Sequence, residues 1–154
     1  MDDASRVIAH LKEQGLTLAT AESLTGGMLG QLLTGVSGSS AVYRGGVISY
    51  CNEVKHQVLD VSKDDLDTLG AVSEPVARQM ALGARRVLSA DIALSTTGIA
   101  GPNSDETGRP VGTVFVGFAS AETTRVLELH LQGDRDAIRR QSCEAALRLC
   151  LESI

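Results

Sequence analysis

Aromatic residues are scarce in this chain, at 3% of 154 residues, and tryptophan does not occur. A folded core must therefore be built from Leu, Val, Ile and Ala, within an overall hydrophobic content of 43%. No low-complexity linker or internal repeat divides the chain. A chain of this length can bury roughly 70% of its unfolded surface in one core. We therefore predict a single domain over residues 1–154.

Basic runs, paired cysteines and long apolar segments are also missing. The net charge is −5, and no basic tail is present to neutralise phosphates, so nucleic acid is not an expected partner. The 3 cysteines form no C-x-x-C pair and the 3 histidines are scattered, which argues against a disulfide framework or a metal site. No segment has the length and apolar character of a membrane span or a signal peptide, so we expect a cytoplasmic protein without a membrane partner.

Hydrophobic periodicity and turn residues predict alternating helices and strands. Helices are expected over residues 4–14, 25–34, 52–59, 62–70 and 73–90 and from residue 134 onward. Strands are expected over residues 16–21, 42–50, 91–96, 112–120 and 124–131, the last two as a hairpin. Asn52 and Ser62 are placed to cap the helices that they precede. This order predicts a mixed sheet with helices on both faces.

The segment 38–55 places a hydroxyl, a phenol and an amine around one predicted strand, on Ser40, Tyr50 and Lys55. A serine becomes a nucleophile when a base removes its proton, and a lysine is such a base when its pKa falls. Lys55 lies in the first turn of a predicted helix, where the dipole disfavours an ammonium ion by about 0.3–1 kcal/mol. Tyr50 could relay between Lys55 and Ser40. Spacing alone also fits a solvated lysine, a core tyrosine and an ordinary turn.

Other catalytic templates fit this segment less well. The tyrosine and lysine of short-chain dehydrogenases are four residues apart on a helix, whereas Tyr50 and Lys55 are separated by five. The G-x-S-x-G and S-x-x-K patterns of other serine enzymes are absent, and so is the P-loop of nucleotide triphosphatases.

Two glycine-rich turns follow predicted strands and could hold an anion. The backbone N–H groups of Gly26 and Gly27 and the hydroxyls of Ser23 and Thr25 could face a phosphate at a helix start. A tight strand-to-helix turn capped by Thr25 is the structural alternative. The second turn, which could be a donor nest or a plain surface loop, consists of Thr97, Gly98, Ile99, Ala100 and Gly101.

The start of the last predicted helix carries Arg135 and Arg139, with Arg140 beside them. These arginines form either a solvated, ion-paired face or a phosphate clamp.

Several segments occur in order along residues 5–150 and together resemble the CinA carboxyl-terminal domain family. These segments are Ala21–Gly27, Gly38–Ala41, Gly45–Lys55, Gly70–Glu74, Thr97–Pro102, Pro110–Val114 and Gly133–Asp136. The resemblance implies a three-layer αβα sandwich with a mixed, mostly parallel sheet of about five strands. It also implies an enzyme that hydrolyses the carboxamide of nicotinamide mononucleotide (NMN), giving nicotinate mononucleotide and ammonia in pyridine-nucleotide recycling.

The resemblance implies that Ser40 is the nucleophile, that Tyr50 and Lys55 activate it, and that neither metal nor cofactor takes part. The residues expected to contact substrate are Ser23, Thr25, Gly26, Gly27, Gly45, Asn52, Thr97, Gly98, Ile99, Ala100, Gly101 and Arg135. A catalytically silent nucleotide-binding or regulatory member of the family is the alternative. The second domain of longer members, linked to pyrophosphatase activity, has no counterpart in these residues, so we expect that activity to be absent. We expect a homo-oligomer with NMN as its small-molecule partner.

Overall fold

The computed structural model describes residues 1–154, which form one sheet, six α-helices and a short 3-10 helix. The helices are α1 (Asp3–Gln14), α2 (Met28–Thr34), α3 (Asn52–Leu59), α4 (Lys63–Thr68), α5 (Glu74–Val87) and α6 (Arg135–Ser153). The strands are β1 (Leu18–Glu22), β2 (Tyr43–Ile48), β3 (Ile92–Gly98), β4 (Thr113–Ala119) and β5 (Thr124–His130). The 3-10 helix η1 (Ser39–Ala41) precedes β2 and was not predicted.

The sheet has the strand order β2-β1-β3-β4-β5. β1 pairs in parallel with both β2 and β3, so these three strands end at the same edge of the sheet. β4 pairs antiparallel with β3 and β5, which confirms the predicted hairpin. Because β5 again runs in the direction of β3, the predicted mixed and mostly parallel sheet is confirmed.

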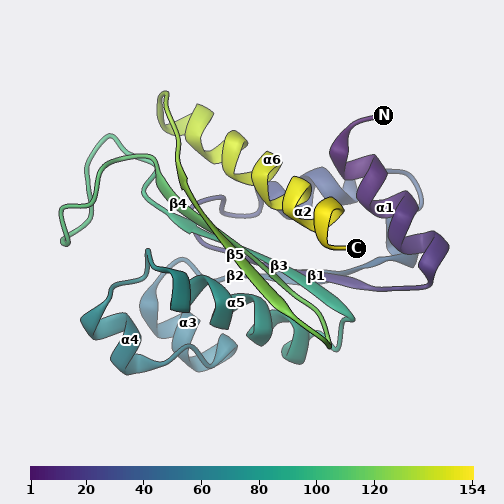
Figure 1. Cartoon of the computed structure of the whole chain (residues 1–154), viewed down its shortest axis with the longest axis horizontal. Helices are drawn as coiled ribbons and strands as arrows, with labels where there is room; N and C mark the ends of the chain where they lie inside the picture. Colours follow the sequence, from purple (N-terminus) through teal and green to yellow (C-terminus); the bar gives the residue numbers. More distant parts are fainter.

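Helices cover both faces of the sheet, with α1, α2 and α6 on one side and α3, α4 and α5 on the other (Figure 1). Successive side chains of a strand point to opposite faces of the sheet, and those of β1 enter two different cores. Leu18 belongs to the core under α1, α2 and α6, while Ala19 and Ala21 belong to the core under α5. Burying a leucine side chain stabilises the fold by about 1.5–3 kcal/mol, so these two cores hold the three layers together. None of the helices combines the length and the apolar character that crossing a bilayer requires.

One of the two predicted helix caps is present, because Ser62 accepts from the N–H of Asp65 at 3.2 Å. Asp134, at the predicted start of the last helix, also acts as a cap and accepts from the N–H of Ala137 at 2.9 Å. The predicted cap at Asn52 is wrong, because the preceding Cys51 has the extended backbone of the cap position and Asn52 is already helical. Cys51 supplies no side-chain hydrogen bond, so the first N–H groups of α3 stay unpaired within the chain.

Candidate active site

The carboxyl ends of β1, β2 and β3 bring together the chemically active side chains of the chain. β1 leads into Ser23, β2 leads into Ser49 and Tyr50, and β3 leads into the loop that contains Gly101. Ser23 continues the pairing of β1 with β3, because its N–H donates to the carbonyl of Thr96 at 3.0 Å. Ligands bind preferentially at such an edge in open α/β sheets.

Lys55 lies at the centre of this edge and is buried, with only 1% of its surface exposed. Its Nζ donates to Oγ of Ser23 at 2.9 Å and to the carbonyl of Ser49 at 2.7 Å. The position follows from the periodicity of α3, whose buried residues are Lys55 and Leu59, one turn apart on the inner face. The helix therefore carries an amine to a place where its period would normally place an apolar side chain.

Burial lowers the pKa of Lys55 from 10.5 to about 8, and Cys51 opposes this shift only in part. The dominant cause is desolvation, because a charged amine loses its hydration while no carboxylate pairs with it. A substantial fraction of Lys55 is therefore neutral at slightly alkaline pH and able to accept a proton. The arrangement is a serine next to a lysine that can act as its base.

The structure does not bring Ser40 to Lys55. Ser40 is exposed in η1, at the amino end of β2, where the neighbouring Val42 accepts from Leu18 at the start of β1. Lys55 follows the other end of β2, and six residues of strand extend about 20 Å. The serine that contacts the lysine is Ser23, which the sequence suggested only as a substrate contact.

Tyr50 does not relay between the lysine and a serine. The residue is 64% exposed, and its hydroxyl accepts from Nη2 of Arg135 at 3.3 Å. The same guanidinium donates from Nη1 to the carbonyl of Gly101 at 2.6 Å. Arg135 therefore joins the amino end of α6 to the residue Tyr50 before α3 and to the loop after β3.

The predicted anion site at Gly26 and Gly27 is occupied by the chain itself. Glu22 is 2% exposed, and its Oε1 accepts from the N–H of Gly27 at 3.1 Å. The N–H of Gly26 donates to the carbonyl of Ser23 at 3.1 Å. The hydroxyl of Thr25 donates to the same Glu22 oxygen at 2.6 Å instead of capping α2. These groups hold the turn and do not face a ligand.

The remaining predicted contacts divide between the site and the scaffold. Thr97 is buried, and its hydroxyl donates to the carbonyl of Ala71 at 2.9 Å, so it supports the loop. Ile99 donates its N–H to Thr113 at 2.9 Å, whereas the N–H groups of Ala100 and Gly101 are unpaired within the chain.

Gly98 lies close to β4, where an added Cβ would lie 2.6 Å from the side chain of Val114. Gly45 lies within β2, opposite Ala19 and away from the carboxyl edge. Asn52 is exposed at the first turn of α3.

Arg139 is a further contributor to the site, with a role that sequence reasoning left open. Its Nε donates to the carbonyl of Leu24 at 2.9 Å and its Nη2 to that of Thr25 at 3.1 Å. The N–H groups of the same two residues donate to nothing in the chain. Arg139 thus holds the turn after Ser23 through the carbonyls of Leu24 and Thr25, and the N–H groups of these two residues are left without a partner in the chain.

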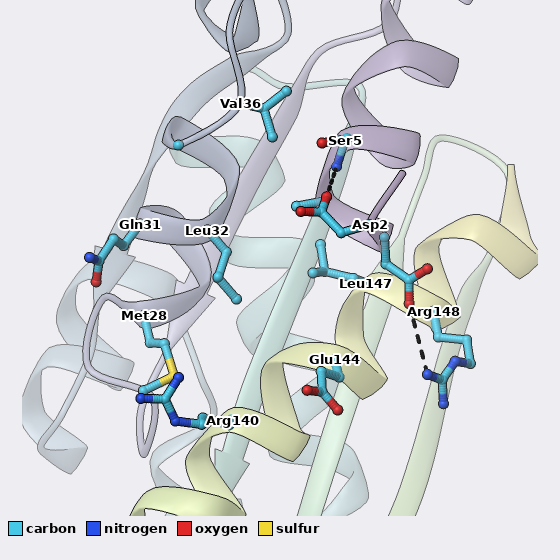
Figure 2. Close-up of a pocket in the computed structure, with 13 residues that line it drawn as sticks. Asp2, Ser5, Met28, Gln31, Leu32, Val36, Arg140, Glu144, Leu147 and Arg148 are labelled. Carbon is cyan, nitrogen blue, oxygen red and sulfur yellow. Dashed lines mark hydrogen bonds and ion pairs between the residues drawn. The ribbon is translucent and has the colours of Figure 1, made fainter.

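A separate groove of about 780 Å³ lies between α1, α2 and α6 (Figure 2). Met28, Leu32 and Leu147 are among its apolar lining residues, and Asp3 and Arg148, which also line it, form an ion pair at 3.8 Å. Its lining includes none of the residues that surround Lys55. No group of three His, Cys, Asp or Glu side chains that could hold a metal ion occurs in the chain.

Fold and site define an αβα protein with a Ser–Lys pair at the carboxyl edge of its parallel strands. The CinA C-terminal domain family matches residues 2–154, and the chain belongs to this family. A CinA-like protein of Geobacter sp. strain M21 is 48% identical over 147 residues, which are 96% of this chain and 35% of that protein. The chain thus spans about a third of the length of the curated relatives that it matches.

Solved structures of the same superfamily have the same fold. A competence-damaged protein (CinA) superfamily protein from Escherichia coli superposes with a TM-score of 0.96 at 32% identity, covering 99% of this chain and 88% of that one. A competence/damage inducible protein from Agrobacterium tumefaciens superposes with a TM-score of 0.94 at 36% identity, covering 97% and 92%.

Proposed function

We propose that this chain hydrolyses the carboxamide of nicotinamide mononucleotide, with Ser23 as the nucleophile and Lys55 as its base. The observation that carries the proposal is the 2.9 Å contact between Nζ of the buried Lys55 and Oγ of Ser23. The lowered pKa of Lys55, about 8, supports the role of a base near neutral pH. The identity of the amide rests on membership of the CinA family and its implied activity.

The reaction proceeds in two halves. Neutral Lys55 takes the hydroxyl proton of Ser23, whose oxygen attacks the carboxamide carbon. The ammonium of Lys55 returns that proton to the departing nitrogen, and ammonia leaves an acyl ester on Ser23. Lys55 then takes a proton from water, whose oxygen attacks the ester carbon. As the ester bond breaks, the ammonium of Lys55 returns that proton to Oγ of Ser23, and the acid product loses its own proton to solvent as the carboxylate.

The tetrahedral intermediate needs donors for its oxyanion. The unpaired N–H groups of Leu24 and Thr25 directly follow Ser23, and those of Ala100 and Gly101 belong to the loop after the neighbouring strand. A well-placed donor of this kind stabilises a transition state by about 3–4 kcal/mol in other hydrolases. The positive end of α2 does not compete with these donors for the oxyanion, because the carboxylate of Glu22 already neutralises it.

Arg135 supplies the positive charge for the substrate phosphate in this proposal. Arg135 is exposed, and its guanidinium contacts the hydroxyl of Tyr50, which lies two residues before α3. A phosphate there would replace a neutral hydroxyl and a carbonyl as partners of the guanidinium, with stronger, charge-assisted hydrogen bonds.

Ammonia release from NMN by the purified protein, measured for three variants, tests the proposal. Ser23→Ala should lower the rate at least about 10³-fold, since removing a nucleophile abolishes the covalent route. Lys55→Met should have a similarly large effect, and the matched control Ser40→Ala should stay near the wild-type rate. A loss confined to Ser40→Ala would overturn the assignment of Ser23. Binding of NMN by calorimetry without ammonia release would instead identify a silent nucleotide-binding member of the family.

A further inference from the structure

The carboxylate of Glu22 is buried next to Ser23 and is held by four hydrogen bonds. Oε1 accepts from the hydroxyl of Thr25 at 2.6 Å and from the N–H groups of Gly27 and Leu29 at 3.1 and 2.9 Å. Oε2 accepts from the N–H of Gly30 at 3.0 Å. A buried carboxylate without such donors would be strongly unfavourable, so the donors and the positive end of α2 are what make its burial possible.

The backbone of Glu22 connects the same residue to Lys55. Its carbonyl accepts from the N–H of Ser49 at 2.8 Å and from the Ser49 hydroxyl at 3.2 Å. The carbonyl of Ser49 in turn accepts from Nζ of Lys55 at 2.7 Å. Glu22 therefore fixes the turn that follows Ser23 through its side chain and the loop that receives Lys55 through its main chain.

The carboxylate of Glu22 fills the donor-lined turn at the start of α2. Its strand-to-helix geometry, with Gly27 at φ 110 and three convergent N–H donors, is the arrangement in which helix starts hold phosphate. The carboxylate reaches this position from the preceding strand and supplies the negative charge permanently. The N–H groups of Leu24 and Thr25 remain outside the cluster of donors that the carboxylate uses.

We propose that Glu22 is a positioning residue, an internal anion that locks the Ser23 turn so that Oγ of Ser23 meets Lys55 and the Leu24 and Thr25 N–H groups face the oxyanion. The expected change in NMN kinetics rests on the proposed function. The expected change in the reactivity of Ser23 toward a covalent label does not depend on the substrate. It assigns Glu22 no contact with substrate. Its effect must therefore appear in kcat, while KM for NMN stays close to that of the wild type.

Glu22→Gln keeps the shape of the side chain and puts an amide donor where only acceptors fit. A displacement of about 1 Å in a catalytic group lowers rates by about 10²-fold, so we expect a fall of that size in kcat with KM changed less than about threefold. Glu13→Gln, which removes an exposed carboxylate from α1, is the matched control and should leave both constants unchanged.

Thr25→Val is the second variant, because Glu22→Gln could unfold the turn altogether. It removes the hydroxyl that donates to Glu22 and preserves the volume of the buried side chain. We expect a smaller loss of kcat, about tenfold, that Thr25→Ser restores because serine keeps the donor. A packing role for Thr25 would give the opposite order, with Thr25→Val active and Thr25→Ser impaired.

Covalent labelling of Ser23 by phenylmethanesulfonyl fluoride, followed by intact mass, separates the two proposals. The labelling rate should fall about 10²-fold in Glu22→Gln, and Ser23→Ala should not be labelled. If the wild type labels at Ser23 but releases no ammonia from NMN, the proposed function fails and the labelling rate alone decides the role of Glu22. The inference would be overturned if folded Glu22→Gln had the kcat and the labelling rate of the wild type. It would also be overturned if the wild-type protein were not labelled at Ser23.

Discussion

Nζ of Lys55 lies 2.9 Å from Oγ of Ser23, although 32 positions of sequence separate the two residues. The contact exists because β1 and β2 are parallel neighbours whose carboxyl ends coincide. Ser23 follows the first of these strands, and Lys55 lies in the first turn of the helix after the second. Burial of the amine at this junction allows Lys55 to act as a base, because it lowers the proton affinity that would otherwise keep Lys55 charged.

The pH dependence of the reaction should reflect Lys55. The pKa of Lys55 is lowered to about 8, and only the neutral amine can take the proton of Ser23. We expect kcat/KM for NMN to rise about tenfold per pH unit below this value and to level off above it. Initial rates of ammonia release between pH 6 and about 9.5 measure this profile.

Ser40→Ala serves as the control for the profile, because Ser40 is exposed at the opposite edge of the sheet and should leave the midpoint unchanged. A rate that is independent of pH over this range would contradict a lysine base.

The elements of this fold follow closely from sequence periodicity, and Lys55 lies in the first turn of a helix, as the sequence predicted. The structure does not place Ser40, the predicted nucleophile, next to Lys55, and the reason is physical. Ser40 precedes β2 and Lys55 follows it, so the length of one strand separates them however close they are in sequence. Finding Ser23 requires knowing that β1 and β2 are adjacent and parallel, which depends on pairing between distant segments.

The glycine turn illustrates a second limit. Gly26 and Gly27 correctly indicated a strand-to-helix turn with convergent donors, but local sequence does not show whether a ligand or the protein fills it. Glu22 immediately precedes the turn, and burial of its carboxylate depends on the packing of α2 against the sheet. A carboxylate just before such a turn is the one signal that could have suggested an internal anion.

Stability should also depend on Lys55, with a sign set by its lowered pKa. Between about pH 8 and 10.5 the unfolded chain binds the Lys55 proton and the folded chain does not. The free energy of unfolding of the wild type, minus that of Lys55→Met, should therefore increase with pH across this window, by up to about 3 kcal/mol. Denaturant titrations at several pH values give the two curves.

The control for this measurement is Lys12→Met, which removes an exposed lysine from α1. Its ammonium stays in water in both the folded and the unfolded state, so the corresponding difference should show no comparable trend. A wild-type minus Lys55→Met difference that stays constant from pH 8 to 10.5 would show that Lys55 keeps its proton in the folded protein.

Arg135 should determine recognition of the phosphate and leave the chemistry at Ser23 largely intact. Its guanidinium holds the carbonyl of Gly101 and the hydroxyl of Tyr50, and both are outside the Ser23–Lys55 contact. Removing one charge-assisted interaction weakens binding by about 1.5–3 kcal/mol, so Arg135→Gln should raise KM for NMN about 10- to 100-fold. The KM for nicotinamide riboside, which has the same amide and no phosphate, should change little, because the lost interaction involves only the phosphate.

Arg140→Gln is the matched control, since Arg140 lies on the same helix and pairs with Asp136 at 3.0 Å. An equal rise in KM for both substrates would mean that Arg135 acts by supporting the Gly101 loop and does not bind the phosphate.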